Sequence, residues 1–259
     1  MERRWGMNGH LTHFEVDADG IALLAMRDPE RKNALSLEMV QELEALCGEI
    51  AHHESIKVLI LTGTDEYFST GADRQVLEQL LSGKVTPRDL LLPRTLLDIP
   101  APVIAAMSGH AIGGGLALGL CADLTVLARE SRYAANFMNY GFTPGLGTTR
   151  LLEHLLGPSL AHEMLLTGQA FRGSHFEGRP GFNYVLPRQD VLKKAFDLAS
   201  IIAEKPRASL SSLKFTLSAR KRELFEAARS SETLMHQITF PLPEVERLIR
   251  EFLEEALPQ

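Results

Sequence analysis

The sequence has few of the residues that mark disulfide-linked or metal-binding proteins. Of its 259 residues only two are cysteines, Cys47 and Cys121, and both lie in apolar segments. A disulfide framework or a cysteine-based zinc site is therefore not predicted. The nine histidines are scattered, and none has the spacing of an HExxH motif or a comparable set of ligands. We expect no metal.

Basic charge and long apolar runs are also scarce. The chain has 27 lysines and arginines against 33 aspartates and glutamates, a formal net charge of -6. A nucleic-acid partner is not expected, because such proteins usually carry a basic excess or stripe. No stretch reaches the roughly 18 uninterrupted apolar residues of a membrane span, and MERRWGMNGHLTH at the N-terminus lacks the apolar core of a signal peptide. We expect a cytoplasmic protein without membrane contacts.

The apolar pattern predicts an α/β fold. Residues 14–26, FEVDADGIALLAM, predict a hairpin with an Asp-Gly turn, and Ser36 is a suitable N-cap for the helix that follows. Strands alternating with helical segments predict βα units around a largely parallel sheet. The buried strands are expected in the short apolar runs at 56–63, 102–109 and 121–128.

The C-terminal part changes character. From Val191 onward we find helix signals and no strand, so the sequence divides into a core at 1–190 and a helical region at 191–259. The segment PEVERLIREFLEEAL carries an apolar stripe that must pack against another surface. The stripe consists of Val245, Leu248, Ile249, Phe252, Leu253 and Leu257.

Two glycine-containing turns carry the functional signal. Residues 110–118 read HAIGGGLAL, between a predicted strand and a small apolar helix start, where backbone amides lack partners. Such a turn can bind an oxyanion, and close packing of helix against sheet explains the glycines equally well. A second turn, in YFSTGADRQVLEQL, has Ala72 just past the glycine and Asp73 in position to cap a helix. Two such turns could direct two amides at one carbonyl.

Over nearly its whole length the chain resembles the crotonase superfamily, the enoyl-CoA hydratase and isomerase group. This resemblance implies a crotonase-like α/β spiral of ββα units, a thioester substrate, and a homotrimer formed through the C-terminal helices, with pairing of trimers left open. It also implies that the amides of Ala72 and Gly114 polarise the thioester carbonyl, each worth about 3 kcal/mol in the transition state. The matching stretches are RKNALS (31–36), VLILTG (58–63), FSTGAD (68–73), PVIAAMSGHAIGGGLALGLCAD (102–123), YGFTPGLGTTRLL (140–152) and LLTGQAF (165–171).

The resemblance also indicates what the site lacks. The enoyl-CoA hydratases that this chain resembles share two glutamates, which hold and deprotonate water. The matching positions here are Ala117 and Phe137. Neither side chain can act as a base. We therefore expect an apolar pocket, with Tyr140 as a further pocket residue, and no simple hydration.

The stretch SRYAANFMNYGFTPGLGTTR (131–150) resembles the decarboxylating crotonase homologues of polyketide β-branching cassettes. Those enzymes act on a 3-methylglutaconyl group carried on the phosphopantetheine of an acyl carrier protein, without another cofactor. A lysine in the loop after the GAD helix and a histidine in the C-terminal helices line their sites. The matching residues are Lys84, in LLSGKVT, and His236, in TLMHQITF.

Decarboxylation requires a cation to orient the departing carboxylate and an acid to protonate the dienolate carbon. Lys84 can supply the cation, while His236 can donate the proton or bind the carboxylate, and the sequence leaves these roles open. The sequence is also compatible with a solvated loop lysine and a histidine satisfied at a helix interface. An enoyl-CoA hydratase or isomerase and a non-catalytic carrier-binding scaffold remain as alternatives. A carrier protein, being acidic, would favour a basic entrance, for which Lys84, Arg88 and Arg94 are near in sequence.

Overall fold

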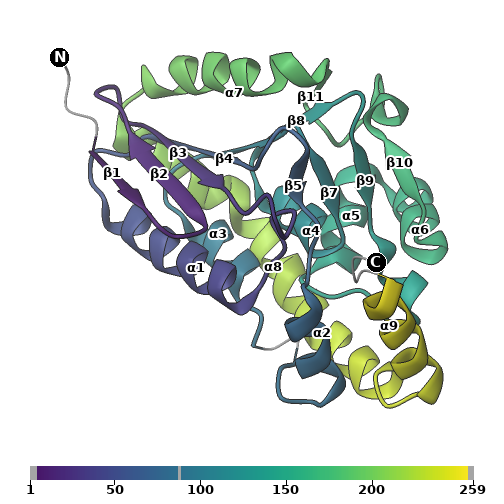
Figure 1. Ribbon diagram of the computed structural model, residues 1–259. Coiled ribbons are helices and arrows are strands. Elements are labelled where there is room, and N and C mark those ends of the chain that lie inside the picture. The colour runs from purple at the N-terminus through teal and green to yellow at the C-terminus, as the bar shows by residue number, and fades with distance from the viewer. Residues whose placement is uncertain (1–4, 87–88, 256–259) are drawn as a thin grey trace.

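The computed structural model describes residues 5–86 and 89–255 (Figure 1). Within these residues the larger sheet has seven strands. The first three pair antiparallel, and all later neighbours pair in parallel. In spatial order they are β1 (Trp5–Asn8), β2 (Thr12–Val16), β3 (Ile21–Met26), β4 (Val58–Thr62), β6 (Val103–Met107), β8 (Leu124–Ala128) and β11 (Tyr184–Leu186).

A second sheet of four described strands lies beside the first (Figure 1). Each of its strands has only three residues, too few to show an alternating pattern, so the sequence did not single them out as strands. Only β10 runs antiparallel to its neighbour. In spatial order they are β10 (Ala170–Arg172), β9 (Arg132–Ala134), β7 (His110–Ile112) and β5 (Tyr67–Ser69).

The chain passes through these two sheets in repeated ββα units. β4 in the large sheet leads to β5 in the small sheet and then to helix α2 (Arg74–Leu81). The next pass runs through β6 and β7 to α4 (Gly114–Cys121), and the third through β8 and β9 to the 3-10 helix η1 (Asn136–Tyr140). The predicted α/β spiral is therefore confirmed. Because β5 and β7 are parallel neighbours, the starts of α2 and α4 come together at one edge of the small sheet.

Local predictions are also confirmed. β2 and β3 form the predicted hairpin. Helix α1 (Leu37–His52) begins after Ser36, whose hydroxyl accepts a hydrogen bond from the Met39 amide at 3.1 Å. Asp73 caps α2 in the same way, accepting from the Val76 amide at 2.9 Å. These caps satisfy amides that the first helical turn leaves unpaired.

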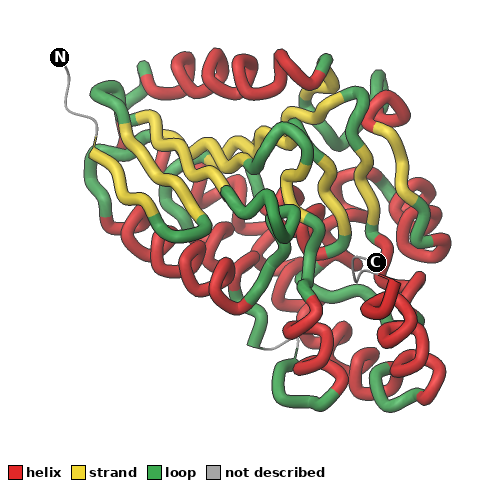
Figure 2. Tube along the Cα trace, in the orientation of Figure 1, coloured by secondary structure: helices red, strands yellow, loops and turns green. Residues whose placement is uncertain are grey.

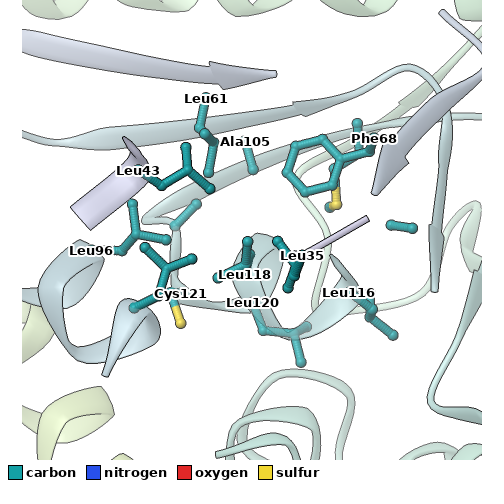
Figure 3. Packing of buried hydrophobic residues seen from close by; sticks show 14 of the residues in the cluster. Leu35, Leu43, Leu61, Phe68, Leu96, Ala105, Leu116, Leu118, Leu120 and Cys121 are labelled. Atoms are coloured by element: carbon teal, nitrogen blue, oxygen red, sulfur yellow. The ribbon is translucent and has the colours of Figure 1, made fainter. Parts of the chain in front are cut away.

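Helices cover the strands on both sides (Figure 2). On one face α7 (Arg188–Ala203) lies across the large sheet, with Ala195 and Ala199 packed against the isoleucines and valines of the strands. On the other face, α1, α3 (Leu92–Asp98) and α4 bury leucines against the sheet, and Leu61 and Ala105 face this cluster (Figure 3). The glycine-rich helix α4 is buried along its whole length.

The C-terminal region packs on the spiral. The remaining helical elements are α5 (Thr148–Leu156), α6 (Pro158–Thr167), η2 (Gly173–Phe176), α8 (Arg207–Thr239) and α9 (Pro243–Glu255). In the stripe of α9, Val245 and Ile249 are fully buried, and Val245 lies against Gly141 just after η1. The stripe therefore packs on its own chain, while Leu257 lies outside the described residues. Helix α7, in the predicted helical region, packs on the large sheet. The division of the chain at residue 190 stays a prediction.

Candidate active site

The two predicted turns touch each other. A Cβ atom on Gly71 would lie only 2.9 Å from the amide nitrogen of Gly114 and 2.9 Å from the carbonyl oxygen of Ile112. Gly71 has a φ of +81°, in the region that favours glycine. Only a residue without a side chain allows the backbones of the two turns to approach this closely.

The orientation of the Ala72 amide follows from a single backbone hydrogen bond. The Leu35 amide donates to the carbonyl of Gly71 at 2.7 Å. In a trans peptide the N–H points opposite to the C=O, so the Ala72 N–H points away from Leu35. Gly114 is the first residue of α4, and its N–H has no partner inside the helix. Two amides from neighbouring turns are thus left to bind a ligand.

These turns open into a cavity of about 280 Å³. Most of its wall is apolar and comes from α1, α2, α3, η1 and α9, including Leu37, Val76 and Phe252. Gly71, Ala72, Gly113 and Gly114 form part of the same wall. The polar side chains that line it are those of Gln41, Glu44, Thr70, Asp89, Asn136, Tyr140 and His236.

His236 reaches the cavity from α8. Its Nε2 lies 2.7 Å from the carbonyl oxygen of Thr143 and 3.2 Å from that of Pro144. Its Nδ1 is buried and has no hydrogen-bond partner among the described residues. Burial lowers the pKa of His236, and the two carbonyls only partly oppose this effect. The imidazole is therefore neutral at pH 7.

A buried carboxylate one helical turn from His236 fixes the same segment. Glu232 accepts hydrogen bonds from the amides of Gly147 and Thr149, at 2.9 and 3.1 Å, and from the Thr149 hydroxyl at 2.7 Å. These amides belong to the start of α5, where a negative charge is favourable. Burial nevertheless raises the pKa of Glu232, because desolvation outweighs the three hydrogen bonds. Together Glu232 and His236 hold the turn that carries Leu146, a cavity residue with a φ of +60°.

An aromatic group forms a further part of the wall. Asn136 Nδ2 donates to the Tyr140 hydroxyl oxygen at 3.1 Å. The ring of Tyr140 stacks on Phe142 and meets Phe252 of α9, whose ring centroid is 4.6 Å away. Burial raises the pKa of the Tyr140 phenol. Tyr140 therefore stays protonated at neutral pH.

Most of the residues singled out from the sequence meet in this cavity. Ala72, Gly114, Phe137, Tyr140 and His236 all line it.

Two of the predicted site residues do not line the cavity. Ala117 is fully buried in α4, and the wall there is formed by Gly114 and Leu118 instead. The Lys84 side chain is exposed, and the Lys84 amide donates to the Gln79 carbonyl. The next residue, Val85, lines the cavity instead. Its catalytic role stays a prediction.

The sequence analysis missed two acidic groups. Glu44 lines the cavity from α1, and burial raises the pKa of its carboxyl. Glu232 was missed as well, although its i, i+4 spacing from His236 was a signal that both share one helix face. At the proposed basic entrance, Arg94 is paired with Asp98 and Glu226, at 2.6 and 2.7 Å, and Arg88 lies outside the described residues.

Neither a metal cluster nor a membrane span is found in the described part of the chain. Within residues 5–86 and 89–255, no three His, Cys, Asp or Glu side chains gather closely enough to hold a metal ion. None of the helices in these ranges is both long and apolar enough to cross a bilayer.

Known proteins similar to this chain over most of its length include polyketide decarboxylases and enoyl-CoA hydratases. The bacillaene synthase decarboxylase PksI of Bacillus subtilis is 42% identical over 244 residues, covering 93% of this chain and 98% of PksI. A structure from a dehydratase/decarboxylase enzyme couple involved in polyketide β-branching has a TM-score of 0.91 at 40% identity, covering 96% of this chain and 99% of that chain. The ECH2 decarboxylase domain of CurF from Lyngbya majuscula has a TM-score of 0.87 at 40% identity, covering 94% and 100%. Residues 17–259 match the enoyl-CoA hydratase/isomerase family. With its ββα spiral and paired glycine turns, the chain belongs to that family.

Proposed function

We propose that this protein decarboxylates a 3-methylglutaconyl thioester carried by an acyl carrier protein and yields a 3-methylcrotonyl-type product in polyketide β-branching. The similarity to PksI and to the CurF decarboxylase domain supports this reaction. One observation in the site carries the proposal. The amides of Ala72 and Gly114 face an apolar cavity. In this cavity Phe137 occupies the position of a glutamate that enoyl-CoA hydratases share.

The chemistry fits such a site. The bond between the terminal carboxylate and its neighbouring carbon breaks, CO2 leaves, and the electron pair enters a dienolate whose charge spreads to the thioester oxygen. Amides that are fixed before the reaction stabilise that oxygen, and each commonly contributes about 3 kcal/mol. A carbon of the dienolate then takes up a proton. An apolar wall favours release of neutral CO2 over the charged ground state.

In this proposal no metal or further cofactor takes part, and the phosphopantetheine arm belongs to the carrier protein. Lys84, whose side chain is exposed in the loop after α2, orients the substrate carboxylate in this proposal. We place the reaction in the cytoplasm.

A homotrimer is also part of the proposal. Large apolar side chains on α8 are exposed in the single chain, among them Leu213, Phe215 and Leu217 at 56%, 70% and 65%. Exposed apolar surface of this kind is typical of a protein interface. Pairing of trimers into hexamers stays open.

A second function is favoured by one residue. Glu44 places a carboxyl with a raised pKa in the cavity wall, and a carboxylate there could move a proton between carbons of a small enoyl-CoA. This would make the protein an isomerase or hydratase with an unusual base.

Intact-mass analysis of a 3-methylglutaconyl carrier protein tests the first function. We expect loss of CO2 with wild-type protein and strong slowing with Lys84→Ala and with His236→Ala. Lys193→Ala, at a lysine whose side chain is 76% exposed, is the matched control and should leave turnover unchanged. Circular dichroism melts confirm that each variant folds. If the substrate mass stays unchanged with wild type, the decarboxylase proposal is wrong, and hydration and isomerisation of crotonyl-CoA become the next assays.

A further inference from the structure

The turn that precedes α5 has an unusual central residue. The Thr148 amide donates to the Gly145 carbonyl at 3.1 Å, which closes a four-residue turn over 145–148. Its two central residues, Leu146 and Gly147, have φ values of +60° and +79°. Turns with two positive φ values are normally built from glycine, asparagine or aspartate, because a Cβ atom crowds the backbone in this region. Gly147 follows this rule, and Leu146 does not.

Contacts from α8 hold the turn in this conformation. Glu232 accepts a hydrogen bond from the Gly147 amide at 2.9 Å. His236 Nε2 lies 2.7 Å from the carbonyl oxygen of Thr143, just before the turn. An unfavourable backbone conformation persists only where the surrounding structure fixes it, and such conformations concentrate at functional sites. The position of the Leu146 side chain is therefore set by packing against α8, against the preference of its own backbone.

The Leu146 side chain lies beside Gly114. Its Cδ1 is 3.0 Å from the position that a Cβ on Gly114 would occupy, and Leu35 Cδ1 is 3.1 Å from the same position. The two leucines thus cover the residue whose amide binds the thioester oxygen in the proposed reaction, and both line the cavity. A leucine side chain neither ionises nor forms hydrogen bonds. What Leu146 contributes at this place is therefore volume.

The same turn also contacts His236. A Cβ on Gly145 would lie 3.3 Å from His236 Cε1, so the imidazole packs on the residue before Leu146. Leu146 itself packs on Gly114, at the other end of this short path. An acyl chain that runs from the Gly114 amide toward His236 passes the Leu146 side chain. The first carbon to pass it is C2, the carbon next to the thioester carbonyl.

We propose that Leu146 is a specificity-determining residue, which selects thioesters that carry no substituent on C2. Its side chain fills the space that a methyl group on C2 would need, whereas the branch of a 3-methylglutaconyl group lies on C3. The inference rests on the proposed function for the identity of the acyl group, but the selection itself acts at binding. One methylene group in an apolar pocket is commonly worth about 10-fold to 200-fold in discrimination.

Binding of two acyl pantetheines tests the selection without turnover. The ligands are the 3-methylcrotonyl thioester and its 2,3-dimethylcrotonyl analogue, which differ by one methyl group on C2, and calorimetry gives both affinities. For the wild type we expect the analogue to bind at least about 10-fold more weakly. In Leu146→Ala and Leu146→Gly this ratio should fall to within about threefold, because the space beside Gly114 opens. Equal affinities in the wild type, or a wild-type ratio in both folded variants, overturn the role of Leu146.

Leu90→Ala is the matched control. Leu90 is another half-buried leucine that lines the cavity, and it lies in the loop before α3. The substitution removes the same atoms from a different part of the wall, so the ratio of the two affinities should stay at the wild-type value. If the ratio falls as far in Leu90→Ala as in Leu146→Ala, the selection belongs to the cavity as a whole and not to Leu146.

Stability tests the strain on which the inference depends. Glycine ordinarily costs more than alanine, because it loses more backbone freedom on folding. At a φ of +60° it also relieves the crowding that any Cβ atom causes. The urea midpoint of Leu146→Gly should therefore lie above that of Leu146→Ala, and the opposite order would contradict the strain at Leu146.

Release of CO2 separates this inference from the proposed function. The substrates are carrier proteins loaded with 3-methylglutaconyl or 2,3-dimethylglutaconyl groups, and intact mass follows both. A wild type that binds selectively but releases no CO2 supports the selection by Leu146 and refutes the decarboxylase. A wild type that releases CO2 from both substrates at equal rates supports the decarboxylase and refutes the selection.

Discussion

The Leu35 amide donates to the Gly71 carbonyl at 2.7 Å and thereby directs the Ala72 amide away from Leu35. Two residues before Leu35 lies Asn33, a fully buried residue with a φ of +53°. The Asn33 side chain donates to the carbonyl of Tyr67 in β5 at 2.8 Å. The RKNALS segment therefore acts as a support for the turn that carries Ala72. This explains why a segment without a catalytic side chain belongs to the family pattern.

Replacing Gly71 should destroy the site. In Gly71→Ala the Cβ would lie 2.9 Å from the Gly114 nitrogen, so the two turns must separate and the paired amides lose their alignment. Loss of one such donor commonly costs about 100-fold to 1,000-fold in rate, and we expect at least this loss of turnover.

Gly178→Ala is the matched control for this change. Gly178 also has a positive φ, +72°, but no atom lies within 4 Å of its would-be Cβ. Its cost should be about 1 kcal/mol of stability, with turnover unaffected. Equal activity of the two variants would contradict the assignment of the amides.

Removing the Glu232 carboxylate should loosen the turn between α5 and the cavity. Glu232→Ala leaves the amides of Gly147 and Thr149 without an acceptor in a buried place. We expect the free energy of unfolding in urea to fall by about 3 kcal/mol. Glu223→Ala, on the same helix at an exposed ion pair with Arg220, should change it by less than about 1 kcal/mol. If the free energy of unfolding falls no further in Glu232→Ala than in Glu223→Ala, the hydrogen bonds of Glu232 add nothing to stability.

His236 should make stability depend on pH below neutrality. Its folded pKa is lowered from 6.5 by burial, so between the folded value and 6.5 the unfolded chain binds more protons than the folded one. The free energy of unfolding therefore rises with pH through this window and falls as pH drops below 6.5. One such proton gives a slope of at most about 1.4 kcal/mol per pH unit.

Urea denaturation of wild type and His236→Gln at several pH values isolates this contribution. The glutamine amide can still donate to Thr143, yet it does not titrate. The difference between the two proteins should be constant above pH 6.5 and change below it. A difference that is independent of pH would mean that His236 has the same pKa in both states.

The buried ion pair between Lys214 and Asp123 should hold α8 to the end of α4. Lys214 Nζ lies 2.6 Å from Asp123 Oδ2, and the lysine is only 3% exposed. Lys214→Met leaves the Asp123 carboxylate without its cation, and we expect about 3 kcal/mol loss in the free energy of unfolding. Adding Asp123→Asn should recover part of the loss. Lys193→Met, at an exposed pair with Asp197, is the control and should cost less than about 1 kcal/mol.

The sequence alone determined the local structure and the family. The hairpin of β2 and β3, the caps at Ser36 and Asp73, and the buried strands were predicted because hydrogen bonds within a turn and apolar periodicity depend on nearby residues. The resemblance through the two glycine turns, and the absence of glutamate at position 137, were also present in the sequence.

Only the tertiary structure decided which groups meet. It brings Gly71 and Gly114 into backbone contact, although 42 residues lie between them, since parallel pairing of β5 and β7 sets their distance. It leaves the Lys84 side chain exposed, and it buries Ala117 behind the cavity wall. The contact between His236 Nε2 and the Thr143 carbonyl also depends on how α8 packs against the rest of the chain. Chain-distant contacts of this kind follow from how whole elements pack, and no local pattern of residues records them.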